Sequence, residues 1–350
     1  MKLDKKLILS MENLEYKSEK TMTNSSIEDI KKNLDILPIV LKWFQSINIE
    51  KLSINDNIVK IVLDEDILSV ENKFFLLDSK IDVLSKEVLL DINNLYLKDY
   101  NILFKGKAKI DYFDEELKYF GDIYYQDLIV SGNIDITKNR VNFFIKSEIF
   151  KNLHFLKKYL NLPEVANSWM YDNVTGDFKL NWFYGEFDLN KNKIIEKSLQ
   201  GDAVIENAKI RFENSLEEIN TSKVNVNFKN STLHFDLVDA IYKEKELKNS
   251  FVTIKDIANE NNGLVLVNIE AKTSLDKDIL GILEAYGIVV PVVQKNGETQ
   301  AKLLLSFPYA EDKPMSYNGV FIAEKSNISI SGFDFETNGA KVILENDLLY

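Results

Sequence analysis

The stretch LFKGKAKIDYFDEELKYFGDIYYQDLIVSGNIDITKNRVNFFIK, residues 103–146, shows the clearest structural pattern in the chain. Apolar residues and glycines occupy every second position through four successive segments, and mostly polar residues stand between them. A period of two places alternate side chains on one side of a pleated strand. The connections are short, as at Lys138–Asn139, so the stretch predicts an antiparallel meander with one apolar and one mostly polar face.

The same alternation extends to both sides of this stretch. Short β-patterned runs recur between Ile47 and Leu97, where the alternation is less regular, and further runs follow from Val174 to Ala271 and from Ala301 to Leu344. The fold class predicted is therefore mainly β, with well over a dozen strands in one or more antiparallel sheets. Asn-Gly pairs stand between strand-like runs, as tight hairpin turns prefer. These pairs lie at positions 262–263, 296–297, 318–319 and 338–339.

About three helical inserts interrupt the strands. A capping-box sequence at Ser25–Glu28 precedes apolar residues at helical spacing, which predicts a helix over about residues 26–46 that caps the sheet. A second helical stripe runs from Ile149 to Leu160, and Pro163 can open another short helix behind it.

The third helical insert begins after residue 273. Ser274 is the expected N-cap, with Asp276 in the first turn. Gly287 ends the helix and Pro291 prevents it from continuing. The inserts divide the chain into three predicted segments: residues 1–146, residues 147–272 and residues 273–350.

Composition and charge exclude several classes of protein. The 350 residues are 45% hydrophobic and 28% charged, which is typical of an ordered protein. A net charge of −12 argues against a nucleic-acid partner. The absence of cysteine excludes disulfides, thiolate zinc sites and cysteine nucleophiles. No apolar run approaches the ~18–20 residues of a membrane span, and residues 1–10 do not resemble a signal peptide.

Catalytic and metal-binding patterns are also absent from the sequence. Only two histidines occur, His154 and His234, and neither has metal-ligand spacing or a nucleophile motif beside it. No phosphate-binding glycine motif occurs. We therefore expect no enzymatic activity and no cofactor, and we interpret the three tryptophans, Trp43, Trp169 and Trp182, as packing anchors.

A sheet with so many apolar residues on one face must bury that face, because leaving it in water costs about 25 cal/mol for each Å². Two arrangements satisfy this requirement: a groove that holds acyl chains, and an ordinary dry core between two sheets. Three glycines on the apolar face, Gly106, Gly121 and Gly132, either bend the sheet or make room for a chain lying across it.

The tract from Trp169 to Leu189, WMYDNVTGDFKLNWFYGEFDL, resembles the AsmA-like family, most closely its YhdP-type branch, which is related to TamB. The family's pattern of a helix ending in tryptophan, a strand with glycine, and G-x-A-x-I-x-x-A-x-I-x-F matches Trp169, Gly176 and the run from Gly201 to Phe212. The later helix DKDILGILEAYG and its following strands resemble the same branch, so that the resemblance extends over about residues 45–350.

This resemblance implies an elongated, curled antiparallel sheet whose apolar interior carries phospholipid between the inner and outer membranes of the cell envelope. It implies a periplasmic location and, in the full-length protein, an N-terminal helix in the inner membrane that this chain lacks. Expected partners are phospholipid acyl chains and proteins of either membrane. No catalytic residues belong to the family, so none are carried over.

The residues expected to contact lipid lie on the apolar face. They are Phe104, Ile110, Tyr119, Ile123, Val130, Ile134, Phe143, Phe178, Val226, Phe228 and Phe235. Two alternatives remain open at this stage. One is a non-catalytic periplasmic scaffold with a dry β core, and the other is a polysaccharide-active β-protein with a carboxylate pair in a cleft.

Overall fold

The computed structural model describes residues 6–16, 43–54, 57–84, 87–111, 113–158, 162–257, 263–310, 312–346 and 348–349. Strands account for 65% of the chain, which confirms the mainly-β prediction. The chain forms two compact units. Unit 1 consists of residues 1–148 and 183–195, and unit 2 consists of residues 149–182 and 196–350. The predicted division into three segments and the curling of the sheet into a groove stay predictions.

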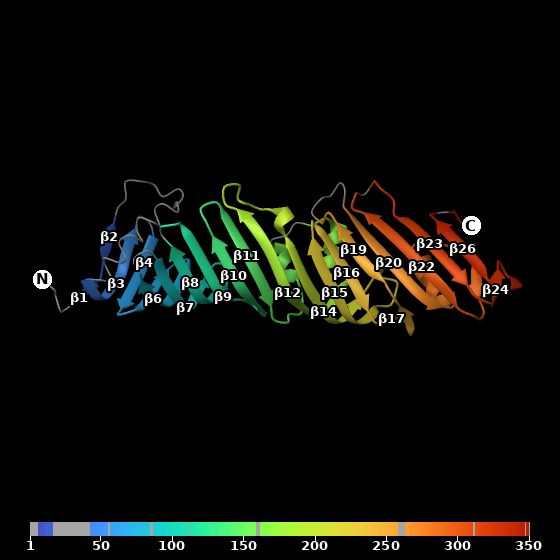
Figure 1. Ribbon diagram of the computed structural model, residues 1–350, viewed down its shortest axis with the longest axis horizontal. Helices are drawn as coiled ribbons and strands as arrows, with labels where there is room; N and C mark the ends of the chain where they lie inside the picture. Colours follow the sequence, from blue (N-terminus) through green and yellow to red (C-terminus); the bar gives the residue numbers. More distant parts are fainter. Residues whose placement is uncertain are drawn as a thin grey trace. The chain divides into compact units, whose positions relative to one another are not determined.

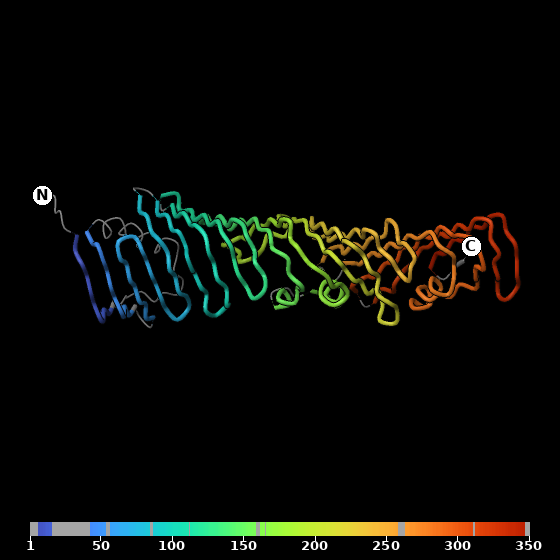
Figure 2. The backbone as a smooth tube through the Cα atoms, turned by 90° about the horizontal axis from the view of Figure 1, so that it is seen from below, coloured from blue at the N-terminus to red at the C-terminus, as the bar shows by residue number. Residues whose placement is uncertain are grey.

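Unit 1 is a meander in which each strand from β3 to β11 pairs antiparallel with the next (Figure 1). The strands are β1 (Leu7–Met11), β2 (Leu14–Tyr16), β3 (Phe44–Ile54), β4 (Asn57–Asp64), β5 (Ile67–Asn72), β6 (Phe75–Val83), β7 (Glu87–Leu97), β8 (Ile102–Asp111), β9 (Glu116–Tyr125), β10 (Leu128–Ile136), β11 (Arg140–Ser147), β12 (Val174–Asp188) and β13 (Lys193–Ile194). The short β1 and β2 pair parallel with β3, and the second half of β12 pairs with β11. The repeated reversals between neighbouring strands are visible in Figure 2.

Unit 2 contains a second meander together with all the described helices. Its helices are η1 (His154–Lys158), α3 (Glu164–Tyr171), η2 (Glu196–Ser198) and α4 (Lys277–Ala285). Its strands are the first half of β12, then β14 (Gln200–Ile210), β15 (Ile219–Lys229), β16 (Thr232–Val238), β17 (Ala240–Tyr242), β18 (Lys245–Leu247), β19 (Phe251–Lys255), β20 (Leu264–Thr273), β21 (Val292–Gln294), β22 (Thr299–Pro308), β23 (Ser316–Ala323), β24 (Ser326–Ile330), β25 (Phe333–Thr337), β26 (Ala340–Glu345) and β27 (Leu348–Leu349).

The main sheet of unit 2 runs in the order β12, β14, β15, β16, β19, β20, β22, β23 and β26. From β14 onward each pair is antiparallel, so strand direction alternates across the sheet. The connections that follow β14, β16, β20 and β23 therefore all lie on the same side of the sheet, at the C-terminal ends of these strands. Strands β21, β24 and β25 form a separate three-stranded sheet.

The helices differ from the prediction in number and extent. The helix expected over residues 26–46 lies mostly outside the described residues, and residues 44–46 belong to strand β3 instead. The helical stripe expected from Ile149 to Leu160 is wrong. Phe150 forms an antiparallel bridge with Phe178, in which each N–H donates to the other carbonyl at 2.9 and 2.8 Å, and the two rings stack at 5.7 Å. This pairing with a distant strand outweighs the local periodicity, and among the described residues of this stretch the short η1 alone is helical.

The other two predicted helices are present. Helix α3 follows Pro163, which occupies the N-cap position and has no side-chain capping bond. In α4 the N-cap is Asp276 rather than Ser274, because the Asp276 carboxylate accepts hydrogen bonds from the N–H groups of Asp278 and Ile279. Gly287 ends α4 as predicted, with a φ of +74°.

One of the predicted Asn-Gly turns is also wrong, since Asn318–Gly319 lies inside strand β23. Gly319 pairs with Leu303 and Leu344 on the neighbouring strands. A side chain at Gly319 would come within 2.9 Å of the Phe321 ring. Glycine at this position therefore makes room for an aromatic side chain and does not form a turn.

Candidate functional site: the apolar sheet face

The residues predicted to share one face of unit 1 do so in register. Strands β8, β9, β10 and β11 align in three cross-strand rows that contain all seven lipid-contact candidates of this unit. These rows are Phe104–Ile123–Val130, Ala108–Tyr119–Ile134–Phe143 and Ile110–Leu117–Ile136–Val141. The alternation in residues 103–146 therefore predicted the strands and the face on which each residue lies, and the structure adds their register.

Strand β7, which contains none of the predicted lipid-contact residues, extends the same rows. Leu95 pairs with Phe104, Leu90 with Ala108, and Val88 with Ile110. The register shifts between Ile92 and Leu95 because β7 carries one extra residue there. Such a shift interrupts the period of two and explains why the alternation in this part of the sequence looked irregular.

Most candidates of unit 1 are only half-buried. Tyr119 is 6% exposed, whereas Phe104, Ile110, Ile123, Val130, Ile134 and Phe143 keep intermediate exposure. The apolar clusters of unit 1 consist, among the described residues, of strand residues alone. Val130 and Phe143 belong to none of the apolar clusters formed by the described residues. This face therefore presents contiguous apolar side chains that the described part of unit 1 does not fully cover.

Three glycines of unit 1, Gly106, Gly121 and Gly132, lie in a single cross-strand row. The Tyr119 ring occupies the space beside Gly121, and its hydroxyl lies 2.9 Å from the carbonyl oxygens of both Lys105 and Asp122. Burial, assisted by the charge of Asp122, raises the pKa of Tyr119 to about 12, so the hydroxyl stays protonated and can donate. At Gly121 the missing side chain therefore makes room for Tyr119.

The opposite face of unit 1 is mostly polar. Ion pairs join Lys109 to Glu87 and Arg140 to Glu186, and they lie at the surface where each contributes about 0–1 kcal/mol. Exposed aromatic side chains interrupt this face, among them Phe120, which is 67% exposed, and Phe144, which is 42% exposed. Phe143 and Phe144 are thus the same residue type at adjacent positions on opposite faces.

Two of the lipid-contact candidates in unit 2 are more deeply buried than most of those in unit 1. Phe178 is 7% exposed and Val226 is 8% exposed, and both belong to the largest apolar cluster. Phe235 packs against that cluster, while Phe228 is half-buried. The structure therefore places Phe178 and Val226 inside a closed core.

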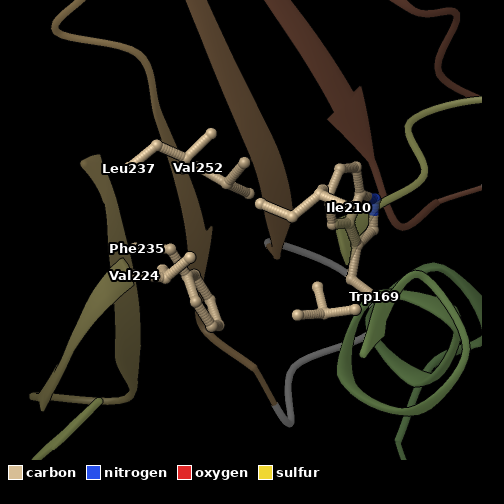
Figure 3. A pocket seen from close by; sticks show the side chains of 7 residues that line it. Trp169, Ile210, Val224, Phe235, Leu237 and Val252 are labelled. Carbon is tan, nitrogen blue, oxygen red and sulfur yellow. The ribbon is translucent and has the colours of Figure 1, made fainter. Parts of the chain in front are cut away.

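Both α-helices that the structure describes in unit 2, α3 and α4, contribute to this core. Trp169 of α3 and Ile279, Ile282 and Leu283 of α4 are buried in the same cluster as the sheet residues. Trp169 reaches from α3 to Ile210, with Val224, Phe235, Leu237 and Val252 facing them across a small apolar cavity (Figure 3). The cavity measures about 10 Å³, which is around the limit for a single water molecule and far too small for an acyl chain.

The remaining candidate sites carry ordinary structural contacts. His234 bonds Thr253 at 2.8 Å and Asp236 at 3.0 Å, and His154 lies 3.7 Å from Asp172. The described residues contain no group of histidine and acidic side chains that could hold a metal ion. Within the same residues, no helix has the length and apolar content needed to cross a bilayer.

Comparison with known proteins identifies the family. The chain is an AsmA-like protein of the YhdP type, and its match to a family model shows this. A family model described as YhdP protein matches residues 156–349, which is more than half of the chain, and the chain therefore belongs to the YhdP family. The match covers nearly all of unit 2, a shorter part than the predicted resemblance over about residues 45–350. Searches of curated proteins and of solved structures returned no match.

Proposed function

We propose that this chain is a segment of a periplasmic protein that carries phospholipids between the inner and outer membranes. In this proposal the apolar face of unit 1 holds the acyl chains, and the protein contributes to outer-membrane lipid homeostasis without catalysing a reaction. In its full-length form an N-terminal helix anchors it in the inner membrane. Membership of the YhdP family supports the proposal.

The observation that carries the proposal is the half-exposed apolar face of unit 1. Aliphatic and aromatic side chains continue in register from β7 to β11, and most retain intermediate exposure. An acyl chain that covered such a row would gain roughly 1 kcal/mol for each half-exposed side chain, at about 25 cal/mol for each Å² of apolar surface. The polar opposite face would keep the protein in water.

A periplasmic scaffold with a dry core is the second candidate, and unit 2 favours it. There the sheet face is closed by α3 and α4, and the cavity beneath Trp169 is too small for a lipid. Under this alternative the half-exposed face of unit 1 would be covered by other protein rather than by lipid.

Site-specific photo-crosslinking in cells separates the two candidates. A photoreactive phenylalanine analogue replaces Phe143 in one variant and Phe144 in another, so that the two variants differ only in the face of β11 that is probed. The proposal predicts phospholipid adducts at position 143 and at least tenfold fewer at position 144. Adducts to protein alone at position 143 would support the scaffold.

A further inference from the structure

The helix α4 and strand β21 belong to an insert between two strands that pair directly with each other. Residues 274–298 form this insert, and the strands on either side, β20 and β22, pair directly up to Thr273 and Thr299. The hairpin of β24 and β25, residues 324–339, has the same construction, because β23 and β26 pair up to Ala323 and Ala340. Both segments therefore connect to the main sheet only at the ends of strands that are already paired.

These two segments also pair with each other. Strand β21 of the insert is hydrogen-bonded to β24 of the hairpin, which forms the separate three-stranded sheet. Both segments leave the sheet on the same side, one at the C-terminal end of β20 and the other at the C-terminal end of β23. We refer to residues 274–298 and 324–339 together as the flap.

The flap covers the apolar face of the unit 2 sheet. Ile279, Leu283 and Val292 of the flap lie in one cluster with Val267 and Leu305, two sheet residues that are 0% exposed. Tyr286 of the flap contacts Phe307 of β22, with ring centroids 5.8 Å apart. Flap side chains thus occupy, in unit 2, the position that acyl chains would occupy on the apolar face of unit 1.

Polar contacts fasten α4 to elements outside the flap. Lys245 lies 3.0 Å from the Asp276 carboxylate and 3.4 Å from that of Asp278, and Lys243 lies 3.1 Å from Asp278. Both lysines belong to the hairpin of β17 and β18. At the other end of α4, the Tyr286 hydroxyl donates to the Phe212 carbonyl at 3.2 Å. A nine-residue helix has little stability alone, so these contacts and the packing keep it in place.

We propose that the flap is a lid over a second acyl-chain site on the unit 2 sheet, and that lipid and α4 compete for this face. This inference rests on the function proposed above. In the closed state α4 occupies the face, and the ion pairs with Lys243 and Lys245 hold it there. Displacement of α4 opens the face to an acyl chain while the pairing of β20 with β22 stays intact.

A tether across the fastening contacts tests the lid. The chain has no cysteine, so two introduced thiols are the only ones present. In the variant K243C/D278C a short bis-maleimide ties α4 to the β17–β18 hairpin. In the matched control E246C/K248C, the same reagent bridges two exposed positions of that hairpin, whose side chains form a 2.9 Å ion pair and do not touch α4.

Each variant carries a photoreactive phenylalanine analogue at Phe307, beneath Tyr286, or at Phe143 in unit 1. The lid predicts phospholipid adducts at 307 in the control and at least tenfold fewer in the tethered chain, with adducts at 143 unchanged. In an untethered chain, Tyr286→Phe should raise adducts at 307 about fivefold, the population change that one neutral hydrogen bond commonly produces.

The other outcomes show whether the lid or the proposed function is wrong. Equal adducts at 307 with and without the tether would overturn the lid, because lipid would then reach the face while α4 stays in place. Adducts at 143 but none at 307 in any chain would show α4 to be a permanent cover, and would leave the function of unit 1 standing. No lipid adducts at either position would overturn the proposed function itself.

Discussion

Replacement of Gly121 with alanine should destabilise unit 1. The added Cβ atom would lie 2.1 Å from the Lys105 carbonyl oxygen, 2.7 Å from the Gly106 Cα atom and 2.8 Å from the Tyr119 hydroxyl. The first two are backbone atoms of β8, so relief of the clash must loosen the β8–β9 pairing. Overpacking of this kind costs about 1–3 kcal/mol.

Gly281 provides a matched control with the opposite expected sign. It lies inside α4, where an added Cβ atom would meet nothing within 4 Å. Alanine is favoured over glycine in a helix interior by roughly 0.5–1 kcal/mol, so Gly281→Ala should stabilise the chain.

Urea unfolding followed by far-ultraviolet circular dichroism measures both changes, and hydrogen exchange at β8 and β9 amides locates the first. The expected result is a lower midpoint for Gly121→Ala, with faster exchange in β8 and β9, and an unchanged or higher midpoint for Gly281→Ala. A Gly121→Ala variant as stable as the parent chain would refute the close approach of β8 and β9 described here.

Three further predictions concern the core, the alkaline range and the acid range. Leu283→Ala should cost about 2–5 kcal/mol in urea unfolding, because Leu283 is 2% exposed in the core beneath α4; a loss below 1 kcal/mol would contradict that packing. Burial raises the pKa of Tyr119 from 10.0 to about 12, so the unfolded chain loses this phenol proton first. Stability therefore falls by about 2–3 kcal/mol as pH rises from 10 through 12, and Tyr119→Phe should remove that share of the loss. The hydrogen bond from Lys243 lowers the pKa of Asp278. The stability that this ion pair contributes is therefore fully present above the usual pKa of 3.8 and is lost as pH falls through the lowered pKa. Asp278→Asn should make hydrogen exchange in α4 less dependent on pH in this acid range, and an unchanged dependence would count against the ion pair.

The strands of unit 1 could be predicted because their information is local. Alternation sets the face, and short turns set the partner, so Phe104, Ile123 and Val130 lie on one face as predicted. The bridge between Phe150 and Phe178 could not be found in this way, because apolar residues near Ile149 also fit a helical stripe and the partner strand is distant in sequence.

The sequence pattern also could not predict which part of the apolar face is covered. Phe143 and Phe178 both stand in alternating runs, yet Phe143 is half-buried and Phe178 lies in a closed core. The difference arises from inserts that fold back onto the unit 2 sheet and bury Trp169, Ile279 and Leu283 with it. Pro163 predicted α3, and the residues that begin and end α4 predicted that helix, but neither signal predicted the surface on which the helices pack.

The central claim is that the apolar face of unit 1 binds acyl chains. The most direct measurement is the phospholipid recovered by organic extraction from each purified chain, in Phe143→Asp and Phe144→Asp variants whose circular dichroism matches the parent. An acyl chain that covers a charged side chain at position 143 removes that charge from water, which costs a large free energy. A charged side chain at position 144 lies on the other face and stays in water. We expect Phe144→Asp to retain the parent amount of phospholipid and Phe143→Asp to lose most of it. Equal recovery from both variants, or none from the parent chain, would contradict the claim.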